Sequence, residues 1–282
     1  MQLPTEFLQQ IENKPASERK EIILNLLNDI SGYSQFAVKI QEFEYKKEIR
    51  TNIIASFTGK SEEKHVVGAH YDIWPNSGGM NDNGAAVFIL LKLIENISSF
   101  SLLNTSIDFV FFDMEEKHQT GAKEFLTQES STILSMINLD MCGIGDYVVF
   151  NQTSEDFPAL STKMTHYCEK NSLNYKILPM MPPGDDIPFR NQNINAISIA
   201  IIPQIAIPVV ERLAYITNSK GLKWKKLTES VKFMFDMIKG VPMLNTMHSS
   251  ADTIDTISVK SIDTVYSVTL QLVKSLIQNK EK

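Results

Sequence analysis

Short apolar runs recur along this sequence, and several of them end at side chains that carry a carboxylate or an imidazole. The side chains at or just after these ends are those of His70, Glu115, Glu116 and Asp140. The runs are rich in Val, Ile and Phe and have the length of buried strands. Since helix-like stretches alternate with them, the pattern predicts an α/β fold with a mixed, largely parallel central β-sheet sandwiched by helices.

The periodicity of the apolar residues places the individual elements. We expect strands at 36–45, 51–58, 64–70, 106–112, 135–140, 146–151 and 194–202, and helices at 17–31, 84–98, 120–128, 155–171 and 258–278. The chain shows no repeat or obvious linker, so one domain over 1–282 is expected. It would begin with a helical segment at 1–32 and carry an insertion at 203–245.

Composition restricts the class of partner. The 282 residues are 43% hydrophobic, enough for a large core, and 27 basic against 33 acidic residues give a formal net charge of −6 without a basic block. A nucleic-acid or membrane surface is therefore not expected, and small molecules or peptides fit better. The N-terminus lacks the pattern of a secretion signal, and two cysteines form neither a disulfide framework nor a thiolate cluster. These features predict a cytoplasmic protein.

Two further metal-binding side chains join the strand ends. Asp82 lies between two asparagines, and His248 follows a long intervening segment. Zinc binds imidazole nitrogen and carboxylate oxygen, and two ions roughly 3.5–4 Å apart can share a bridging ligand. If Asp82 is the bridge, His70 and Asp140 hold one ion and Glu116 and His248 hold the other. A single strand-end Asp is more often a turn cap, but the five residues together indicate a two-metal hydrolytic site.

Two acidic residues next to these ligands have separate expected roles. Neighbouring side chains on an extended strand point in opposite directions, so Glu115 is not expected to be a second ligand beside Glu116. Beyond the strand end it can instead reach a water between the metals, as the general base and later the acid toward the leaving amine. Asp72, two residues after His70, is placed to orient that imidazole.

The stretches GAHYD, NDNGAA, INLDM and MHSSADT, with the Glu-Glu pair after a strand, resemble the co-catalytic zinc aminopeptidase family, which includes leucine-aminopeptidase-like metallopeptidases and is related to the glutaminyl cyclases. The resemblance is strong over 50–145 and weaker over 184–260. It implies an α/β sandwich, two zinc ions and hydrolysis of the first peptide bond of peptides with a free N-terminus, through a metal-bridging hydroxide and a glutamate base. It assigns the ligands, the base and the orienting Asp as above, and implies a cis peptide between Asp82 and Asn83.

Three features depart from the family pattern. Met247 stands where many relatives have a tyrosine that stabilises the oxyanion, and Tyr215 is a candidate substitute or a packing aromatic. Asp185 matches a family acid, but Asp186 replaces the usual histidine; with Phe189 these residues could line the substrate pocket, or the two acids could form a turn that caps a helix. The third departure is the insertion, which could be a lid, an oligomer contact or core packing through Trp224, Phe233, Met234, Phe235 and Met237.

Three functions follow from these residues. A zinc aminopeptidase agrees with the acidic surroundings, which suit a substrate amine. A carboxypeptidase is less expected, because Arg190 and Arg212 are the only arginines after His70. The second function is a glutaminyl cyclase, whose relatives use one zinc and lack the first histidine, so the presence of His70 favours the hydrolase. The third is a catalytically weak binding protein on the same fold, for which Met247 is the only sign.

Overall fold

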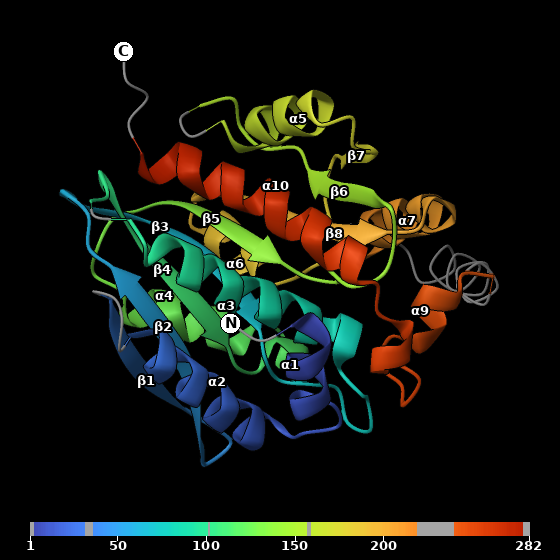
Figure 1. Cartoon of the computed structure of the whole chain (residues 1–282), viewed down its shortest axis with the longest axis horizontal. Coiled ribbons are helices and arrows are strands. Elements are labelled where there is room, and N and C mark those ends of the chain that lie inside the picture. The colour runs from blue at the N-terminus through green and yellow to red at the C-terminus, as the bar shows by residue number, and fades with distance from the viewer. Residues whose placement is uncertain (1–2, 32–35, 101, 157–158, 219–239, 279–282) are drawn as a thin grey trace.

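The computed structural model of the chain describes residues 3–31, 36–100, 102–156, 159–218 and 240–278 (Figure 1). Its eight strands are β1 (Ala37–Tyr45), β2 (Glu48–Phe57), β3 (Ser61–His70), β4 (Thr105–Phe112), β5 (Ile133–Leu139), β6 (Tyr147–Asn151), β7 (Tyr175–Leu178) and β8 (Asn195–Ile202). The α-helices within the described ranges are α1 (Pro4–Ile11), α2 (Ala16–Ser31), α3 (Ala85–Ile97), α4 (Thr120–Gln128), α5 (Leu160–Lys170), α6 (Asp186–Asn191), α7 (Ile207–Asn218), α9 (Pro242–Thr246) and α10 (Val259–Ile277).

The strands form a single mixed sheet in the order β1-β2-β4-β3-β5-β8-β6-β7. Its four central strands, β4, β3, β5 and β8, run parallel to one another. Strand β2 is antiparallel to β4 at one side, and β6 is antiparallel to β8 at the other. The prediction of a mixed sheet with a largely parallel centre is confirmed.

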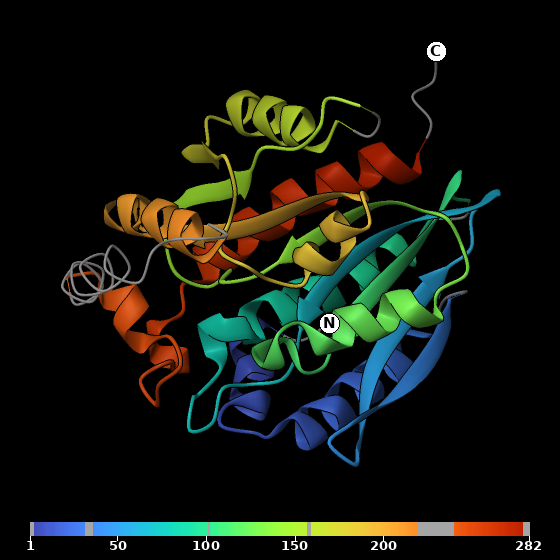
Figure 2. The same ribbon diagram turned by 180° about the vertical axis from the view of Figure 1, so that it is seen from behind.

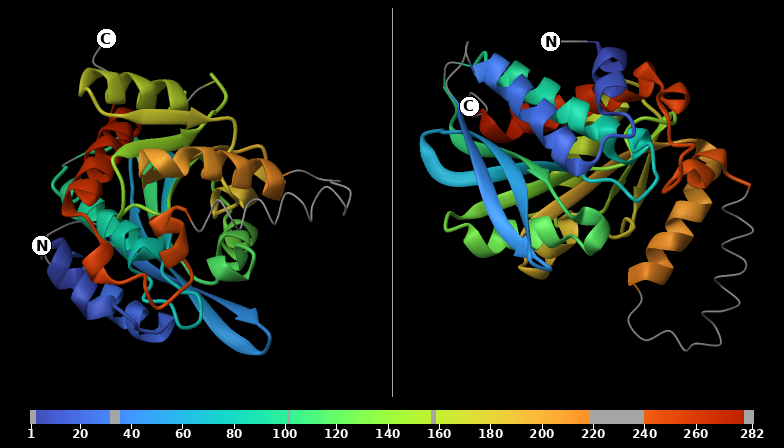
Figure 3. Two further views of the ribbon diagram at one scale, coloured as in Figure 1. Left: turned by 90° about the vertical axis from the view of Figure 1, so that its right-hand side faces the viewer. Right: turned by 90° about the horizontal axis from the view of Figure 1, so that it is seen from below.

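Helices cover both faces of this sheet. Helices α1, α2, α3, α5 and α10 lie over one face (Figure 1), and α4, α6 and α7 lie over the other (Figures 2 and 3). Strand β8 shows how the sequence produces the two layers. Its Ile197, Ile199 and Ile201 join the large core under the first group of helices, whereas Ala200 and Ile202 pack with α7. Because side chains alternate along a strand, a continuous apolar run supplies both cores.

The register of the central strands brings their carboxyl ends to one edge. Strand β3 pairs with β4 so that His70 lies opposite Phe112, and with β5 so that Gly68 lies opposite Asn138. Both neighbours therefore end at about the level of His70. The residues that follow β4 and β5 leave the sheet beside this histidine, where ligands gather in parallel α/β sheets.

Most elements agree with the sequence-based expectation, with a few differences. The segment 1–32 contains two helices, because Asn13 adopts a left-handed conformation (φ 56°) before α2 begins near Pro15. Strand β7 was not expected, and α5 begins at Leu160 rather than near 155. Of the expected insertion, α7 packs on the sheet, whereas the five aromatic and methionine residues between 224 and 237 lie outside the described residues. No helix in the described ranges is long and apolar enough to cross a bilayer.

Candidate metal centre

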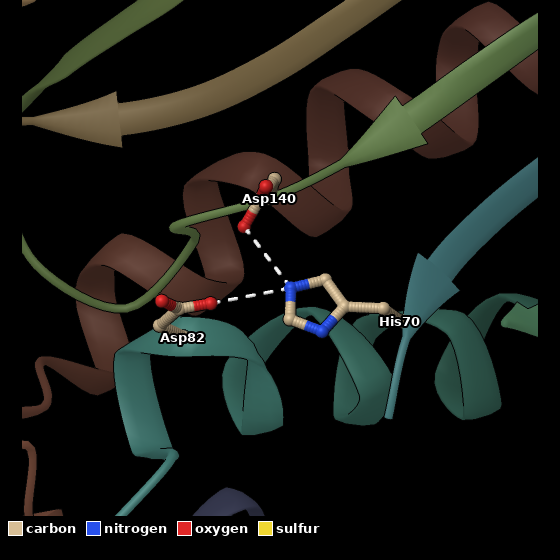
Figure 4. A group of neighbouring side chains, drawn as sticks. All are labelled: His70, Asp82 and Asp140. Atoms are coloured by element: carbon tan, nitrogen blue, oxygen red, sulfur yellow. Dashed lines mark ion pairs between the residues drawn. The ribbon is translucent and has the colours of Figure 1, made fainter. Parts of the chain in front are cut away.

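The first cluster forms around His70, the last residue of β3. Its Nε2 lies 3.2 Å from Oδ1 of Asp82 and 3.7 Å from Oδ1 of Asp140 (Figure 4). Asp140 directly follows β5, and Asp82 lies in a short turn, Met80–Gly84, that leads into α3. The peptide between Asp82 and Asn83 is cis, as the family resemblance implied.

The second cluster forms around His248 and uses the same aspartate. The His248 Nε2 lies 3.2 Å from Oδ2 of Asp82 and 3.3 Å from Oε2 of Glu116. One carboxylate oxygen of Asp82 thus faces each histidine. Within the described residues, the ligand atoms of His70, Asp82 and Asp140 lie within 4.8 Å of one another, and so do those of Asp82, Glu116 and His248. This arrangement matches the sequence-based pairing, with Asp82 shared.

The charges of these clusters favour a bound cation. Hydrogen bonding to Asp82 and Glu116 raises the pKa of His248 to about 10. Burial alone would lower the pKa of His70, but hydrogen bonds to Asp140 and two other aspartates outweigh burial and raise it. Oε1 of Glu116 and Oδ1 of Asp140 are buried and have no hydrogen-bond partner among the described residues. Two carboxylates with an unpaired oxygen therefore need positive charge, and the imidazole and carboxylate donors suit zinc.

The backbone around the clusters is unusual. Met114 (φ 62°), Met141 (φ 57°) and His248 (φ 58°) all adopt the left-handed conformation that residues other than glycine rarely take. Met114 lies directly before Glu115, and Met141 directly follows Asp140. Such conformations occur where the surrounding structure holds a functional site in place.

Asp72 connects the loops that follow β3 and β4. Its Oδ1 accepts a hydrogen bond from the backbone N–H of Glu115 (3.0 Å), and its Oδ2 accepts one from that of Glu116 (3.3 Å). Its backbone oxygen lies 3.2 Å from Nδ1 of His70, and Oδ1 lies 3.5 Å from the same nitrogen. Asp72 thus contacts one residue of each cluster and can fix the orientation of both.

Glu115 lies next to both clusters without belonging to either. Gln119 donates a hydrogen bond from Nε2 to its Oε1 at 3.0 Å. Burial raises the pKa of Glu115 to about 8. A carboxylate whose pKa is raised in this way can both take up and release a proton near neutral pH.

Two contributors to the site were not identified from the sequence. Asp252, which is fully buried, accepts hydrogen bonds from the backbone N–H groups of Asn81 (2.7 Å) and Asp82 (3.1 Å). The Trp74 ring stacks on the ring of His248, with centroids 4.5 Å apart. Asp252 belongs to the stretch MHSSADT, four residues after His248, and Trp74 lies two residues after the stretch GAHYD. No short-range pattern shows that they contact residues elsewhere in the chain.

Asp252→Ala is expected to lower the affinity for zinc by about 10- to 100-fold, as loss of a residue that orients a metal ligand commonly does. The substitution leaves two buried N–H groups in the Asp82 turn without acceptors, so the shared carboxylate loses its fixed position. Competition with a chromogenic chelator measures the affinity. Asp255→Ala is the matched control, because Asp255 is exposed three residues further on. Equal affinities for both variants would contradict the role of Asp252.

A cavity of about 350 Å³ opens beside the clusters. Asp82, Glu115, Glu116, Asp140 and His248 line one part of it. The remaining lining is largely apolar and comes from β8, α7, α9 and three loops: Met141, Met181, Pro182, Pro183, Ala200, Ile202, Val210, Leu213, Met243, Leu244 and Met247. Met247 is therefore in contact with the cavity, as expected. The cavity thus has a polar end at the two clusters and an apolar remainder, which is the usual composition of a small-molecule site.

The other residues expected to bind substrate do not line this cavity. The prediction for Phe189 is wrong, because its side chain is fully buried and packs against Phe112 and Phe125. Tyr215 is 55% exposed and lines a separate surface pocket, so it does not replace the missing tyrosine.

Asp185 and Asp186 are both buried, and neither lines the cavity beside the clusters. The Asp186 carboxylate lies 3.5 Å from Nε of Arg190. Asp185 precedes α6 but makes no capping hydrogen bond, so the helix-cap interpretation is not observed either.

Comparisons with known proteins identify a family and relatives of the chain. The model of peptidase family M28 matches residues 52–273. Aminopeptidase Y of Saccharomyces cerevisiae is 25% identical over 209 residues, which are 70% of this chain and 38% of that protein. Leucine aminopeptidase 1 of Coccidioides posadasii is 31% identical over 129 residues, 40% of this chain and 33% of the relative. The chain thus spans well under half the length of these relatives.

Solved structures show the same fold. BSAP, a zinc aminopeptidase from Bacillus subtilis, superposes with a TM-score of 0.63 at 18% identity, covering 84% of this chain and 53% of that one. The glutaminyl cyclase of Porphyromonas gingivalis superposes with a TM-score of 0.70 at 18% identity, covering 97% of both chains. At these identities the likeness concerns the fold.

Proposed function

Because the chain belongs to peptidase family M28, we propose that it is a two-zinc aminopeptidase that removes the first residue of peptides with a free N-terminus. The observation that carries this proposal is the pair of clusters that share Asp82, with Glu115 beside them at the end of an apolar cavity. Relatives named as aminopeptidases support the same class of reaction.

The residues of the two clusters would hold the ions. His70 and Asp140 would hold one ion, His248 and Glu116 would hold the other, and Asp82, whose two oxygens face the two histidines, would contribute to both. Two zinc ions so bound supply Lewis acidity, which polarises the scissile carbonyl and makes water a better nucleophile.

Glu115 moves the protons of the reaction. It takes a proton from the attacking water and then delivers one to the leaving amine. Gln119 and the backbone hydrogen bond to Asp72 restrict its position, so the carboxylate is oriented before substrate arrives. Met247 lines the cavity but has no hydrogen to donate, so the oxyanion depends on the ions and on other donors.

The cavity determines which end of a peptide is bound. The carboxylates around its polar end attract the substrate's α-amine, and its apolar part accommodates an apolar first side chain. At about 350 Å³ it has room for a side chain such as that of leucine or methionine. Methionine side chains form much of the wall and can adapt to different apolar groups.

A glutaminyl cyclase is the second candidate, and its specific support is the full-length match to a cyclase fold. A cyclase closes an N-terminal glutamine onto itself rather than cleaving a peptide bond. The presence of His70, which completes the first cluster beside that of His248, favours the hydrolase.

The deciding experiment combines metal analysis with a substrate panel. We expect about two zinc ions per chain and faster hydrolysis of leucyl- and methionyl-4-nitroanilide than of the lysyl and aspartyl derivatives. A chelator should abolish the activity, and added zinc should restore it. About one zinc per chain, with pyroglutamate formed from glutaminyl peptides, would favour the cyclase.

A further inference from the structure

A second cavity, of about 640 Å³, borders the metal centre at Glu116 and Asp72. Its other walls come from the loops after β3 and β4, from the connection between α1 and α2, and from the hairpin between β1 and β2. The last two precede the first metal ligand in the sequence. The hairpin contributes Lys46 and Arg50, and the loop after β4 contributes Lys117. The first cavity shares Glu116 with this one, so the two cavities lie on either side of the same ligand.

Apart from Glu116, a candidate metal ligand, the acidic residues in the wall of this second cavity already have partners. Asp72 accepts the two backbone N–H groups described above, and Asp113 accepts those of Met114 (2.9 Å) and Thr51 (3.4 Å). Glu48 forms an ion pair with Nη2 of Arg50. The carboxylates of Asp72 and Asp113 are thus held by backbone N–H groups, and that of Glu48 is paired with a cation.

The two lysines have no such partner. In the described part of the chain, neither ammonium forms an ion pair: Nζ of Lys46 lies over the Tyr45 ring at 5.3 Å, and Nζ of Lys117 lies over the Trp74 ring at 4.8 Å. The Nε–H of Arg50 is buried and also lacks an acceptor. Because the ammonium groups of Lys46 and Lys117 line a concave surface without an ion-pair partner among the described residues, the cavity is suited to an anion.

The position of Lys117 relates this charge to the proposed reaction. Trp74, over which its ammonium lies, also stacks on His248, a ligand of the second cluster. The ammonium is therefore separated from the metal centre by one indole ring. An extended chain advances about 3.3–3.6 Å per residue. The C-terminal carboxylate of a di- or tripeptide that is cleaved at the metals can therefore reach past the Trp74 ring to the Lys117 ammonium.

We propose that the second cavity binds the carboxylate of the substrate's leaving portion, through Lys46 and Lys117, and that the preferred substrates are short peptides with a free C-terminus. This inference rests on the proposed aminopeptidase function and adds its substrate class. An acidic side chain at the third position of a longer peptide has the same chemistry and is the other source of the carboxylate.

The test compares Leu-Gly-Gly with its C-terminal amide. We expect wild-type protein to favour the free acid by about tenfold in kcat/KM, the size of one charge-assisted hydrogen bond. This preference should shrink at high salt. In the double variant Lys46→Met/Lys117→Met, the ratio of kcat/KM for the free acid to that for the amide should approach one. Each single variant should show a smaller reduction of this ratio. Methionine at position 117 keeps the contact with Trp74 without the charge. Lys47→Met is the matched control, because Lys47 is the neighbouring hairpin residue and does not line the cavity.

Binding separates this inference from the proposed function. The same two peptides are titrated calorimetrically into zinc-loaded Glu115→Gln protein, with and without the lysine substitutions. A free-acid preference that the lysine substitutions remove supports the inference even if leucyl-4-nitroanilide is not hydrolysed by the native protein. Equal binding of acid and amide overturns it even if the nitroanilide is cleaved. Leu-Gly-Asp-amide distinguishes the sources: binding as tight as that of Leu-Gly-Gly indicates recognition of a side chain and overturns the free C-terminus requirement.

Discussion

Glu115→Gln is expected to lower kcat by about 100- to 10,000-fold, the range for loss of a general acid–base group, while the zinc content stays unchanged. Glutamine has the same shape but cannot take a proton from water. Glu115 makes its side-chain hydrogen bond to Gln119 and lies in neither cluster of candidate ligands, so zinc should remain bound. Leucyl-4-nitroanilide turnover and metal analysis on the same sample measure the two quantities.

The control for this variant is Glu62→Gln. Glu62 is exposed near the start of β3, at the opposite end of the strand from His70, and its substitution should leave both quantities unchanged. If Glu115→Gln loses zinc, Glu115 is a ligand rather than the base. If it keeps both its zinc and its turnover, another group moves the proton.

The site residues at the strand ends could be predicted because metal-binding side chains directly follow the apolar runs that form the strands. Val, Ile and Phe runs specify buried strands, and in a parallel sheet the carboxyl ends of such strands meet at one edge. His70, Asp140 and the Glu115–Glu116 pair could therefore be assigned to one location without coordinates. The register of β3 with β4 and β5 places them there.

Contacts between distant loops could not be predicted in the same way. Asp252 holds the Asp82 turn across 170 residues of sequence, and no local pattern encodes that pairing. Phe189 was expected in the substrate pocket from its place in a motif, but α6 directs it into the core against two other phenylalanines. Motif position indicates where the backbone lies, whereas burial of a side chain depends on the neighbouring elements.

The basic hairpin shows a similar limit. The small number of arginines after His70 disfavoured recognition of a substrate carboxylate. Lys46 and Arg50 precede His70 and were not part of that argument. The order of strands in the sheet places β2 beside β4 and β1 beside β2. Their hairpin therefore borders the loop that carries Glu116, although it precedes every metal ligand in the sequence.

Asp82→Ala is expected to remove zinc from both clusters and to abolish turnover. The two oxygens of this carboxylate lie 3.2 Å from the two histidines, and among the described residues Asp82 is the one member that both clusters share. Without it, each ion keeps one imidazole and one carboxylate, one ligand short of the three protein ligands typical of catalytic zinc. Zinc content after dialysis against a weak chelator measures the loss.

Asp140→Ala is the matched comparison for this prediction. It removes a carboxylate from the His70 cluster alone, so the His248 cluster should keep about one zinc per chain with its ligands intact. The difference between the variants isolates the shared role of Asp82, since each loses one aspartate at the same edge of the sheet. Retention of one tightly bound zinc by Asp82→Ala would show that one cluster binds its ion without the bridge. Asp82 would then not be required by both ions, and its assignment as the shared ligand would be wrong.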